Sequence, residues 1–332
     1  MDVDLNSHPS APSDLGRKPR ITVVGAVNVD ITGTPDQPLV AHDSNPGRVI
    51  TSLGGVGRNI ADNLARLGAS VDLVTALGDD SNAAYIRQDC ARLGISLAHS
   101  LQVSDSATSS YLCINDDQGD MHIAVNDMRL IDSLTPEFLA SRLPAINQSD
   151  LLVIEANLTQ AAIEFLVGHV SIPIIAEPVS TRKAIRLLNV LDRLQLIKPN
   201  RIEAEILSDI TIREAADLPR AAAALHARGV RQVCISLGRD GVYCSDADTA
   251  ETYPILPGRV VNTTGCGDAF FSACAWGVCH NLPLALTSRL GLAASAICLE
   301  WPGAISPDMT FDNVLNRSGL NLYQIKEKRM KP

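Results

Sequence analysis

The sequence predicts an α/β fold: a doubly wound, mostly parallel sheet flanked by helices, with a small β-sheet lid. Short, continuous apolar runs, typical of strands buried on both faces, alternate with helix-length segments along most of the 332 residues. Several of these runs end on polar residues, as expected where the carboxyl ends of parallel strands border a ligand site. Four β-rich pieces interrupt the alternation and lack helix partners, so we assign them to the lid.

The first buried strand is predicted within residues 21–30, after a polar leader of residues 1–20 that is rich in proline and serine. We expect this leader to be disordered. The apolar run ends on Asn28 and Asp30, which makes both side chains candidates for binding sugar hydroxyls. A simple turn at the end of the strand is the alternative.

The predicted lid is formed by about residues 34–53 and 107–127. In each half a turn signal joins two strand-like pieces, at residues 45–47 (Asn-Pro-Gly) and at residues 116–119. We expect the four pieces to pair into one sheet that covers the site. Their exposed edges predict a homodimer surface.

A glycine-rich stretch follows the first half of the lid and opens an amphipathic helix. Residues 54–59 read Gly-Gly-Val-Gly-Arg-Asn. With Gly54, Gly55 and Gly57 the backbone can approach a ligand closely, while Asn59 points into the same space. Alone, such a stretch is a weak signal.

The middle of the chain alternates as a doubly wound protein should. Strands are predicted at residues 71–77, 151–155, 172–178 and 194–200, with helices at residues 83–93 and 161–167. Right-handed crossovers place the carboxyl ends of these strands along one rim. Glu155 ends one of them and is a candidate substrate ligand.

Asn200 and Glu203 lie three residues apart where a strand passes into a helix, so both can face one cavity. A capping box, with asparagine at the N-cap and glutamate at the third helical position, explains the same spacing, and the two roles are compatible. Further on, residues 233–244 read as a strand, a glycine turn and a second strand, as in a hairpin.

The most informative stretch is residues 260–271, where Gly265 and Gly267 flank Cys266 and an apolar, helix-length run begins at Asp268. Backbone N–H groups at a helix N-terminus have no partner inside the helix and bind anions. An acid beside a phosphate would repel it unless the acid takes a proton from an attacking hydroxyl. The alternative is that Asp268 only caps the helix.

Residues 262–268 closely resemble the second signature of the ribokinase-like, or phosphofructokinase B-type, sugar and nucleoside kinases. That signature is usually Asp-Thr-Thr-Gly-Ala-Gly-Asp, so Asn262 and Cys266 depart from it. Residues 54–59 resemble the first signature of the same family, in which the asparagine contacts the sugar. Within the family the resemblance is closest to bacterial pseudouridine kinases, and it runs from about residue 21 to beyond residue 303.

The resemblance implies one kinase domain over residues 21–316, followed by a C-terminal tail of residues 317–332. It implies phosphorylation of the 5′-hydroxyl of pseudouridine with ATP and magnesium, often helped by potassium. In this reading Asp268 is the general base, and residues 265–267 form an anion hole. Asn200 and Glu203 support the magnesium.

The remaining site residues combine this resemblance with the chemistry of the side chains. In the family, the turn that contains Ser236, Gly238 and Gly241 borders the nucleotide, and Thr264 lies in the second signature. The last long helical pattern, residues 284–299, carries small residues, among them Ala294, that would let it lie close to an adenine. The nucleoside would be held by the hydroxyl-binding residues and glycines named above together with Asn45, Ser109, Asn126 and Glu155. Two alternatives stay open: another kinase of this fold, acting on ribose, adenosine, or inosine and guanosine, and a catalytically silent sugar- or nucleotide-sensing protein.

Net charge, the length of apolar stretches and the cysteine pattern indicate which partners and which cellular compartment to expect. The formal net charge is −9, and the only cluster of lysine and arginine is in the tail, which argues against nucleic acid as a partner. No apolar stretch is long enough for a membrane helix, so we expect no membrane partner. The eight cysteines show no Cys-x-x-Cys pair and most lie in apolar segments, as expected of free thiols in the cytoplasm.

Overall fold

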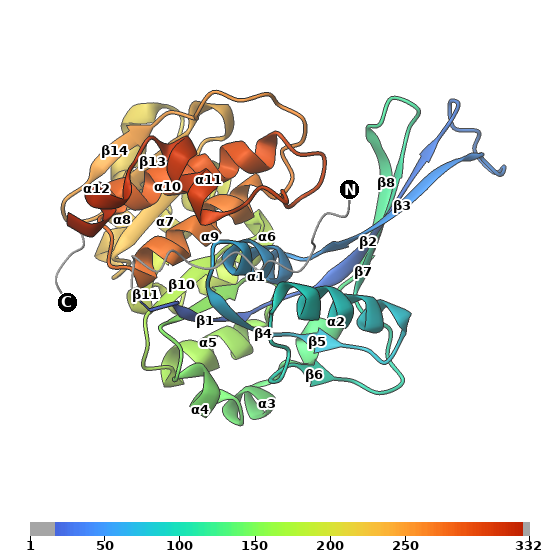
Figure 1. Cartoon of the computed structure of the whole chain (residues 1–332), viewed down its shortest axis with the longest axis horizontal. Coiled ribbons are helices and arrows are strands. Elements are labelled where there is room, and N and C mark those ends of the chain that lie inside the picture. The colour runs from blue at the N-terminus through green and yellow to red at the C-terminus, as the bar shows by residue number, and fades with distance from the viewer. Residues whose placement is uncertain (1–16, 328–332) are drawn as a thin grey trace, which may run out of the picture.

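The computed structural model describes residues 17–327 and is built around an eight-stranded sheet of order β14-β13-β12-β11-β10-β9-β1-β4 (Figure 1). The strands are β1 Arg20–Val24, β4 Ser70–Val74, β9 Leu151–Glu155, β10 Ile174–Glu177, β11 Leu194–Ile197, β12 Gln232–Ser236, β13 Val242–Ser245 and β14 Ala250–Tyr253. From β4 to β12 all neighbours are parallel, whereas β13 and β14 are antiparallel additions. The predicted doubly wound, mostly parallel sheet is confirmed.

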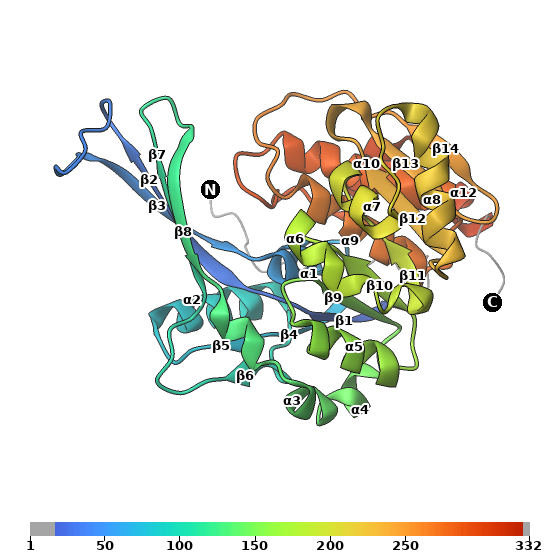
Figure 2. The same ribbon diagram turned by 180° about the vertical axis from the view of Figure 1, so that it is seen from behind.

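Helices cover both faces of this sheet (Figures 1 and 2). One face carries α1 Val56–Arg66, α2 Ser81–Leu93, α9 Cys266–Cys279, α10 Leu284–Leu299, α11 Phe311–Ser318 and α12 Leu322–Glu327. The other carries α3 Pro136–Ala140, α4 Leu143–Ile146, α5 Gln160–His169, α6 Thr181–Ala184, α7 Arg201–Ser208 and α8 Leu218–Ala227. Successive strand residues point to opposite faces, so Val23 packs into the first core and Val24 into the second.

The lid is a separate four-stranded sheet that projects from the body (Figures 1 and 2). Its order is β3-β2-β7-β8, with β2 Asn28–Pro35, β3 Gly47–Gly54, β7 Ser110–Asn115 and β8 Met121–Asp127. The β2–β7 pairing is parallel and the other two are antiparallel. A two-stranded sheet of β5 Ala76–Leu77 and β6 Leu101–Gln102 lies below the lid.

The strand composition of the lid differs from the prediction. Residues 28–30, expected to end the first buried strand, instead begin the lid strand β2 Asn28–Pro35, because the chain leaves the main sheet after Val24. Residues 39–44, expected to be strand-like, form a loop in which His42 adopts a positive φ of 64°. This loop is closed by a hydrogen bond from the Asp36 N–H to the Pro46 carbonyl at 3.0 Å.

The two ends of the chain also bear on the predicted boundaries. The expected leader lies outside the described residues up to residue 16. The described part of the expected C-terminal tail, residues 317–327, packs on the body, because Leu320 and Ile325 are buried in the core. Leu320 and Ile325 are separated by mostly polar residues, so the sequence pattern alone did not predict that this segment is buried.

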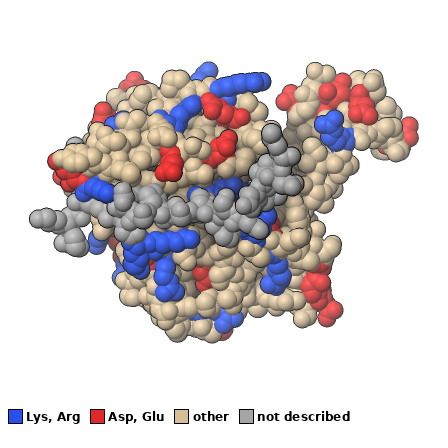
Figure 3. All heavy atoms as spheres, in the orientation of Figure 1, with Lys and Arg blue, Asp and Glu red and all other residues tan. Residues whose placement is uncertain are grey.

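Surface charge and helix length bear on whether the protein has a broad anion-binding surface or a membrane-spanning helix. On the face shown in Figure 3, acidic and basic side chains are interspersed over the described part of the body, so anions must be bound by local groups there. Among residues 17–327, every helix is too short or too polar to cross a membrane.

Candidate active site

The loop before α9 is shaped by Gly265. This residue is the N-cap of α9 and has a φ of 83°, a conformation that favours glycine. A Cβ here would also collide with the carbonyl oxygen of Ala304. The Cys266 N–H donates back to the Thr263 carbonyl at 3.3 Å, a long hydrogen bond. The first turn of α9 is therefore a candidate anion-binding turn.

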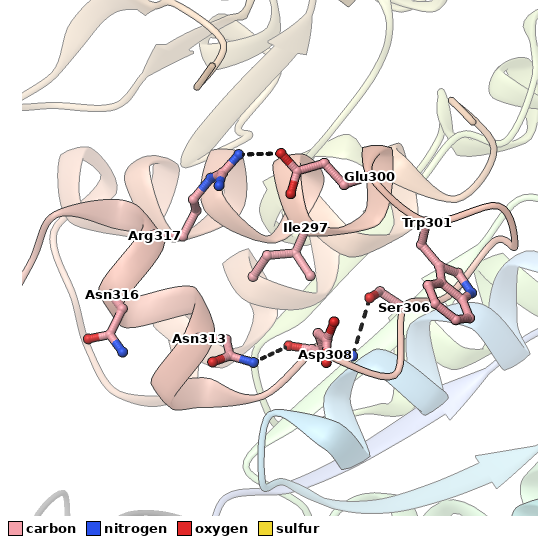
Figure 4. Close-up of a pocket in the computed structure, with 8 residues that line it drawn as sticks. All are labelled: Ile297, Glu300, Trp301, Ser306, Asp308, Asn313, Asn316 and Arg317. Atoms are coloured by element: carbon pink, nitrogen blue, oxygen red, sulfur yellow. Dashed lines mark hydrogen bonds and ion pairs between the residues drawn. The ribbon is translucent and has the colours of Figure 1, made fainter. Parts of the chain in front are cut away.

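The loop before α9 is bonded to a second loop, which follows α10 and contains Pro302. Asn262, which stands where the family signature has an acid, donates from its side chain to the Pro302 carbonyl at 2.8 Å and accepts from the Thr264 N–H at 2.9 Å. Figure 4 shows the far side of this supporting loop, a cavity of about 420 Å³ between α10 and α11 that is bordered by the Glu300–Arg317 ion pair (2.7 Å). The amide of Asn262 therefore ties the two loops together.

Asp268 lies in the first turn of α9, partly buried, and accepts a hydrogen bond from Asn59 Nδ2 at 2.9 Å. Burial and the nearby charge of Glu177 raise the pKa of Asp268 to about 7, against the opposing effects of Asn59 and Lys198. A carboxylate with a pKa near neutrality is suited to accept a proton at physiological pH. The two predicted signatures, 209 residues apart at this contact, thus meet in one place.

Lys198 was not among the predicted site residues, but it is a prominent charge here. It is almost fully buried and pairs with Glu177 at 2.8 Å. Its ammonium nitrogen lies 3.4 Å from where a Cβ on Gly267 would be. Burial lowers the pKa of Lys198, but Glu177 outweighs that effect and raises it, so the lysine is charged beside the anion-binding turn. The signal in the sequence was a lysine placed directly after a buried strand.

The predicted sugar-binding residues gather at the junction of the lid and the body. Asn28 donates to Asp30 at 2.5 Å, and in the lid register Asn28 lies opposite Gly54. A Cβ on Gly54 would strike the Asp30 carboxylate, and burial raises the pKa of Asp30. A Cβ on Gly55 would lie only 2.5 Å from the Ala26 carbonyl oxygen, so the glycines keep this junction tight.

Gly57 approaches the turn after β1 in the same way, since a Cβ on it would lie 2.7 Å from the carbonyl carbon of Gly25. Together with Asn59 one turn later, the glycine-rich stretch packs against the end of β1 and reaches Asp268. The structure therefore brings the lid base, α1 and α9 together.

Glu155 does not face an open site. It is fully buried, and its two oxygens accept from the Ala26 N–H at 2.5 Å and from the Asn157 N–H at 2.7 Å. Burial raises its pKa to about 7. We correct its predicted role as a substrate ligand: its carboxyl group is occupied in holding the turn after β1.

The predicted lid residues are scattered. Asn126 lines a cavity of about 490 Å³ that also contains Asn157 and Lys183, two residues absent from the sequence-based site. Ser109 is buried, and its carbonyl accepts from the Val29 N–H at 3.0 Å, so it belongs to the lid base.

Asn45 is not brought to the site. Its side chain bonds Val40 and Asp43 within its own loop, at the outer end of the lid. We correct its predicted substrate contact accordingly, because these bonds use both ends of its amide.

A cavity of about 440 Å³ adjoins the anion-binding turn on the side away from the lid. Its walls include Ser236, Gly238, Gly241, Cys266 and Gly267, all predicted site residues. Lys198 and Thr263 also line it, whereas Thr264 is exposed next to it.

Ala294 is a correction to the predicted nucleotide site, because it is fully buried inside the core. Its neighbours Ser295 and Ala296 line the cavity instead. Successive side chains on a helix point about 100° apart, so Ala294 can face the core while Ser295 faces the cavity.

Asn200 and Glu203 form the capping box at the start of α7. The Asn200 N–H donates to Glu203 Oε2 at 2.8 Å, and the Glu203 N–H donates to Asn200 Oδ1 at 2.9 Å. Burial raises the pKa of Glu203. Within residues 17–327 no three acidic, histidine or cysteine side chains gather as a candidate metal cluster.

Comparisons with known proteins agree on the fold. The profile described as pfkB family carbohydrate kinase matches residues 18–310. The chain is 33% identical over 305 residues to the pseudouridine kinase of Escherichia coli, covering 91% of this chain and 97% of that one. It is 26% identical to the guanosine-inosine kinase of Exiguobacterium acetylicum, covering 87% of this chain and 98% of the relative.

Among solved structures, a ribokinase from Arabidopsis thaliana complexed with ribose and ATP superposes with a TM-score of 0.80. It is 21% identical, and the match covers 92% of this chain and all of the other.

Proposed function

The chain belongs to the pfkB family of carbohydrate kinases, and on that premise we propose that it transfers the γ-phosphate of ATP to the 5′-hydroxyl of pseudouridine. Family membership makes it a phosphotransferase with an alcohol acceptor, a sugar or nucleoside kinase. The observation that carries the site is the contact between Asn59 and Asp268, which joins the sugar-side glycine stretch to the anion-binding end of α9.

In the proposed reaction, Asp268 accepts the proton of the 5′-hydroxyl as its oxygen attacks the γ-phosphorus in line. The pKa of about 7 leaves a useful fraction of Asp268 ionised at neutral pH. The backbone N–H groups of residues 265–267 and the ammonium group of Lys198 stabilise the charge on the phosphoryl oxygens. The N–H groups of this turn need no large movement, because α9 is buried almost all round, and Lys198 is held by its ion pair with Glu177.

ATP is assigned to the cavity of about 440 Å³ beside α9. Its apolar wall from Phe270, Leu292 and Ala296 suits a purine, and its polar end at Gly267 and Lys198 suits phosphates. Magnesium would neutralise the phosphate charge, with Glu203 and Asn200 holding its waters. Potassium is proposed as an activator near the loop that contains Asn262.

Pseudouridine is assigned to the junction of the lid and the body, with its ribose at Asp30 and Asn59. The base would extend toward the cavity that contains Asn126, Asn157 and Lys183. Amide and ammonium groups can bond the carbonyl and N–H groups of a uracil ring. The likeness to the Escherichia coli pseudouridine kinase favours this substrate over the other nucleosides.

A coupled ADP assay across pseudouridine, uridine, ribose, adenosine, inosine and guanosine tests the proposal. The highest kcat/KM is expected with pseudouridine, with Asp268→Asn as the inactive control. Faster turnover of inosine and guanosine would transfer the assignment to the purine nucleosides, and faster turnover of ribose to sugars. ATP consumption with none of the six would leave a sensing protein as the better reading.

We also propose that the lid joins two copies of the chain. The lid register places Val49, Ile31, Leu112 and Val125 across one face of the sheet. Val49 and Val125, on the two edge strands of this sheet, are 70% and 65% exposed, an unusual exposure for apolar side chains that share one face. A second lid sheet presents the same apolar face and is therefore a self-complementary partner.

Sedimentation tests the dimer: Val125→Arg should convert it to a monomer, whereas Tyr323→Arg, at an exposed site on α12, should not. A wild-type chain that sediments as a monomer at all concentrations would refute the interface. Activity in the cytoplasm is proposed because all eight cysteines are free thiols.

A further inference from the structure

Two asparagine side chains on α1 carry buried polar atoms without a partner among residues 17–327. Asn59 Nδ2 donates to Asp268, but Asn59 Oδ1 is buried and accepts nothing. Asn63 is fully buried, and both its Oδ1 and its Nδ2 are unpartnered. An unpaired buried amide is costly and is usually explained in a native protein by a bound water or ion.

Helix geometry brings the residues that carry the three unpartnered atoms together. Asn59 and Asn63 are four residues apart on one helix, so their side chains are neighbours on the same face. Helix α1 packs against α9, Asn59 bonds Asp268 of α9, and both asparagines are buried. A buried water typically makes about three hydrogen bonds, and Asn59 Oδ1 with the two ends of Asn63 supplies that number.

We propose that Asn63 is a positioning residue: one buried water bound between Asn63 and Asn59 keeps the Asn59 NH2 group turned toward Asp268. The water donates to Asn59 Oδ1 and Asn63 Oδ1 and accepts from Asn63 Nδ2. Without it, Asn59 loses the partner of its oxygen and is free to rotate. A rotated Asn59 would set an amide oxygen against the carboxylate, which is repulsive.

This inference rests on the proposed role of Asp268 as the base. The groups that act on Asp268 are Glu177 at the end of β10, Lys198 after β11, Glu155 at the end of β9 and Asn59 on α1. Asn59 is the neutral member and favours the ionised carboxylate. Loss of its hydrogen bond therefore raises the pKa of Asp268, and the acid limb of the pH–rate profile moves to higher pH.

Asn63→Leu tests the proposal, because leucine has a similar volume and no hydrogen-bonding atoms. We expect kcat to fall about tenfold, in line with the loss of one positioning hydrogen bond, while the KM for ATP stays within about twofold. The acid limb of kcat/KM should move to higher pH. Asn63→Ser, which keeps a hydroxyl that can bind the water, should recover most of both effects.

Ile60→Val is the matched control. Ile60 is fully buried on the same helix, so this change lowers Tm by disturbing core packing and should leave the pH profile in place. An Asn63→Leu enzyme that loses Tm as Ile60→Val does but keeps the wild-type pH profile would show a purely structural role. In an Asn59→Ala background, Asn63→Leu should have no further effect on the profile, and an additive effect would overturn the mechanism.

A high-resolution crystal structure of the wild-type protein tests the water itself and does not depend on any variant folding. A density peak within hydrogen-bonding distance of Asn59 Oδ1 and Asn63 is expected. A direct contact of Asn63 with another group, or an empty apolar gap, would overturn the proposal. If Asp268→Asn kept its turnover while the water was present, the proposed base would be wrong and the water site would stand.

Discussion

Replacing Asp268 with asparagine should increase stability and remove turnover in the same variant. Burial and Glu177 raise the pKa of Asp268 from 3.8 to about 7. The folded protein therefore binds this proton more tightly than the unfolded chain does. Asp268 favours folding below about pH 3.8, and this contribution is lost as the pH rises through about 7.

The size of the effect follows from the pKa change. Each tenfold change in proton affinity corresponds to 1.36 kcal/mol, so the rise to about 7 corresponds to at most about 4 kcal/mol at pH 8. Asparagine resembles the neutral acid and avoids this cost. Urea unfolding at pH 8 should show Asp268→Asn to be the more stable protein, with the gain shrinking toward acidic pH, while kcat falls by roughly 10² to 10⁴.

Asp62→Asn is the matched control on the neighbouring helix. The Asp62 carboxylate is buried between Arg58 at 2.8 Å and Arg66 at 2.5 Å. Its loss leaves Arg66 without its ion pair and Arg58 paired with Asp89 alone, at 2.7 Å. We expect Asp62→Asn to lower the free energy of unfolding at pH 8, with kcat close to that of the wild type. An Asp268→Asn variant that is destabilised as Asp62→Asn is, or that keeps its turnover, would refute the reasoning.

Three further predictions concern pH and the walls of the site. With Asp268 ionising at about 7, kcat/KM should be roughly tenfold lower at pH 6 than its plateau above pH 8, and a flat profile in this range would contradict the assignment. Gly265→Ala should abolish activity by colliding with Ala304, whereas Gly119→Ala, at a similar φ with open space around it, should lose stability only, as seen by kinetics and thermal unfolding. Ala296→Phe should fill the ATP cavity and raise the KM for ATP at least tenfold with little change in Tm, and an unchanged KM would argue against ATP there.

The order of strands and helices was predictable because the spacing of apolar residues within each segment indicates its secondary structure. Residues 284–299 were predicted as a helix and form α10 with the same bounds. The lid strand β2 was missed for a non-local reason: its pairing with residues 110–114 of β7, not its own pattern, separates it from β1.

In the site, too, features set by local sequence were predictable and features set by distant contacts were not. The glycine turn with Asp268 at the start of α9 was predictable from the sequence, because glycines beside an acid at a helix start have few chemical explanations. The orientation of Glu155 was not accessible, since its partner Ala26 lies 129 residues earlier in the chain. Lys198 was missed because its position beside Gly267, in the first turn of α9, depends on how the end of β11 and the start of α9 pack together in space.

A crystal structure with pseudouridine and a non-hydrolysable ATP analogue tests the central claim most directly. The account predicts one Asp268 oxygen within about 3.2 Å of the 5′-hydroxyl oxygen, with the γ-phosphate facing the N–H groups of residues 265–267. A 5′-hydroxyl that lies against another group, or a γ-phosphate bound away from this turn, would contradict it.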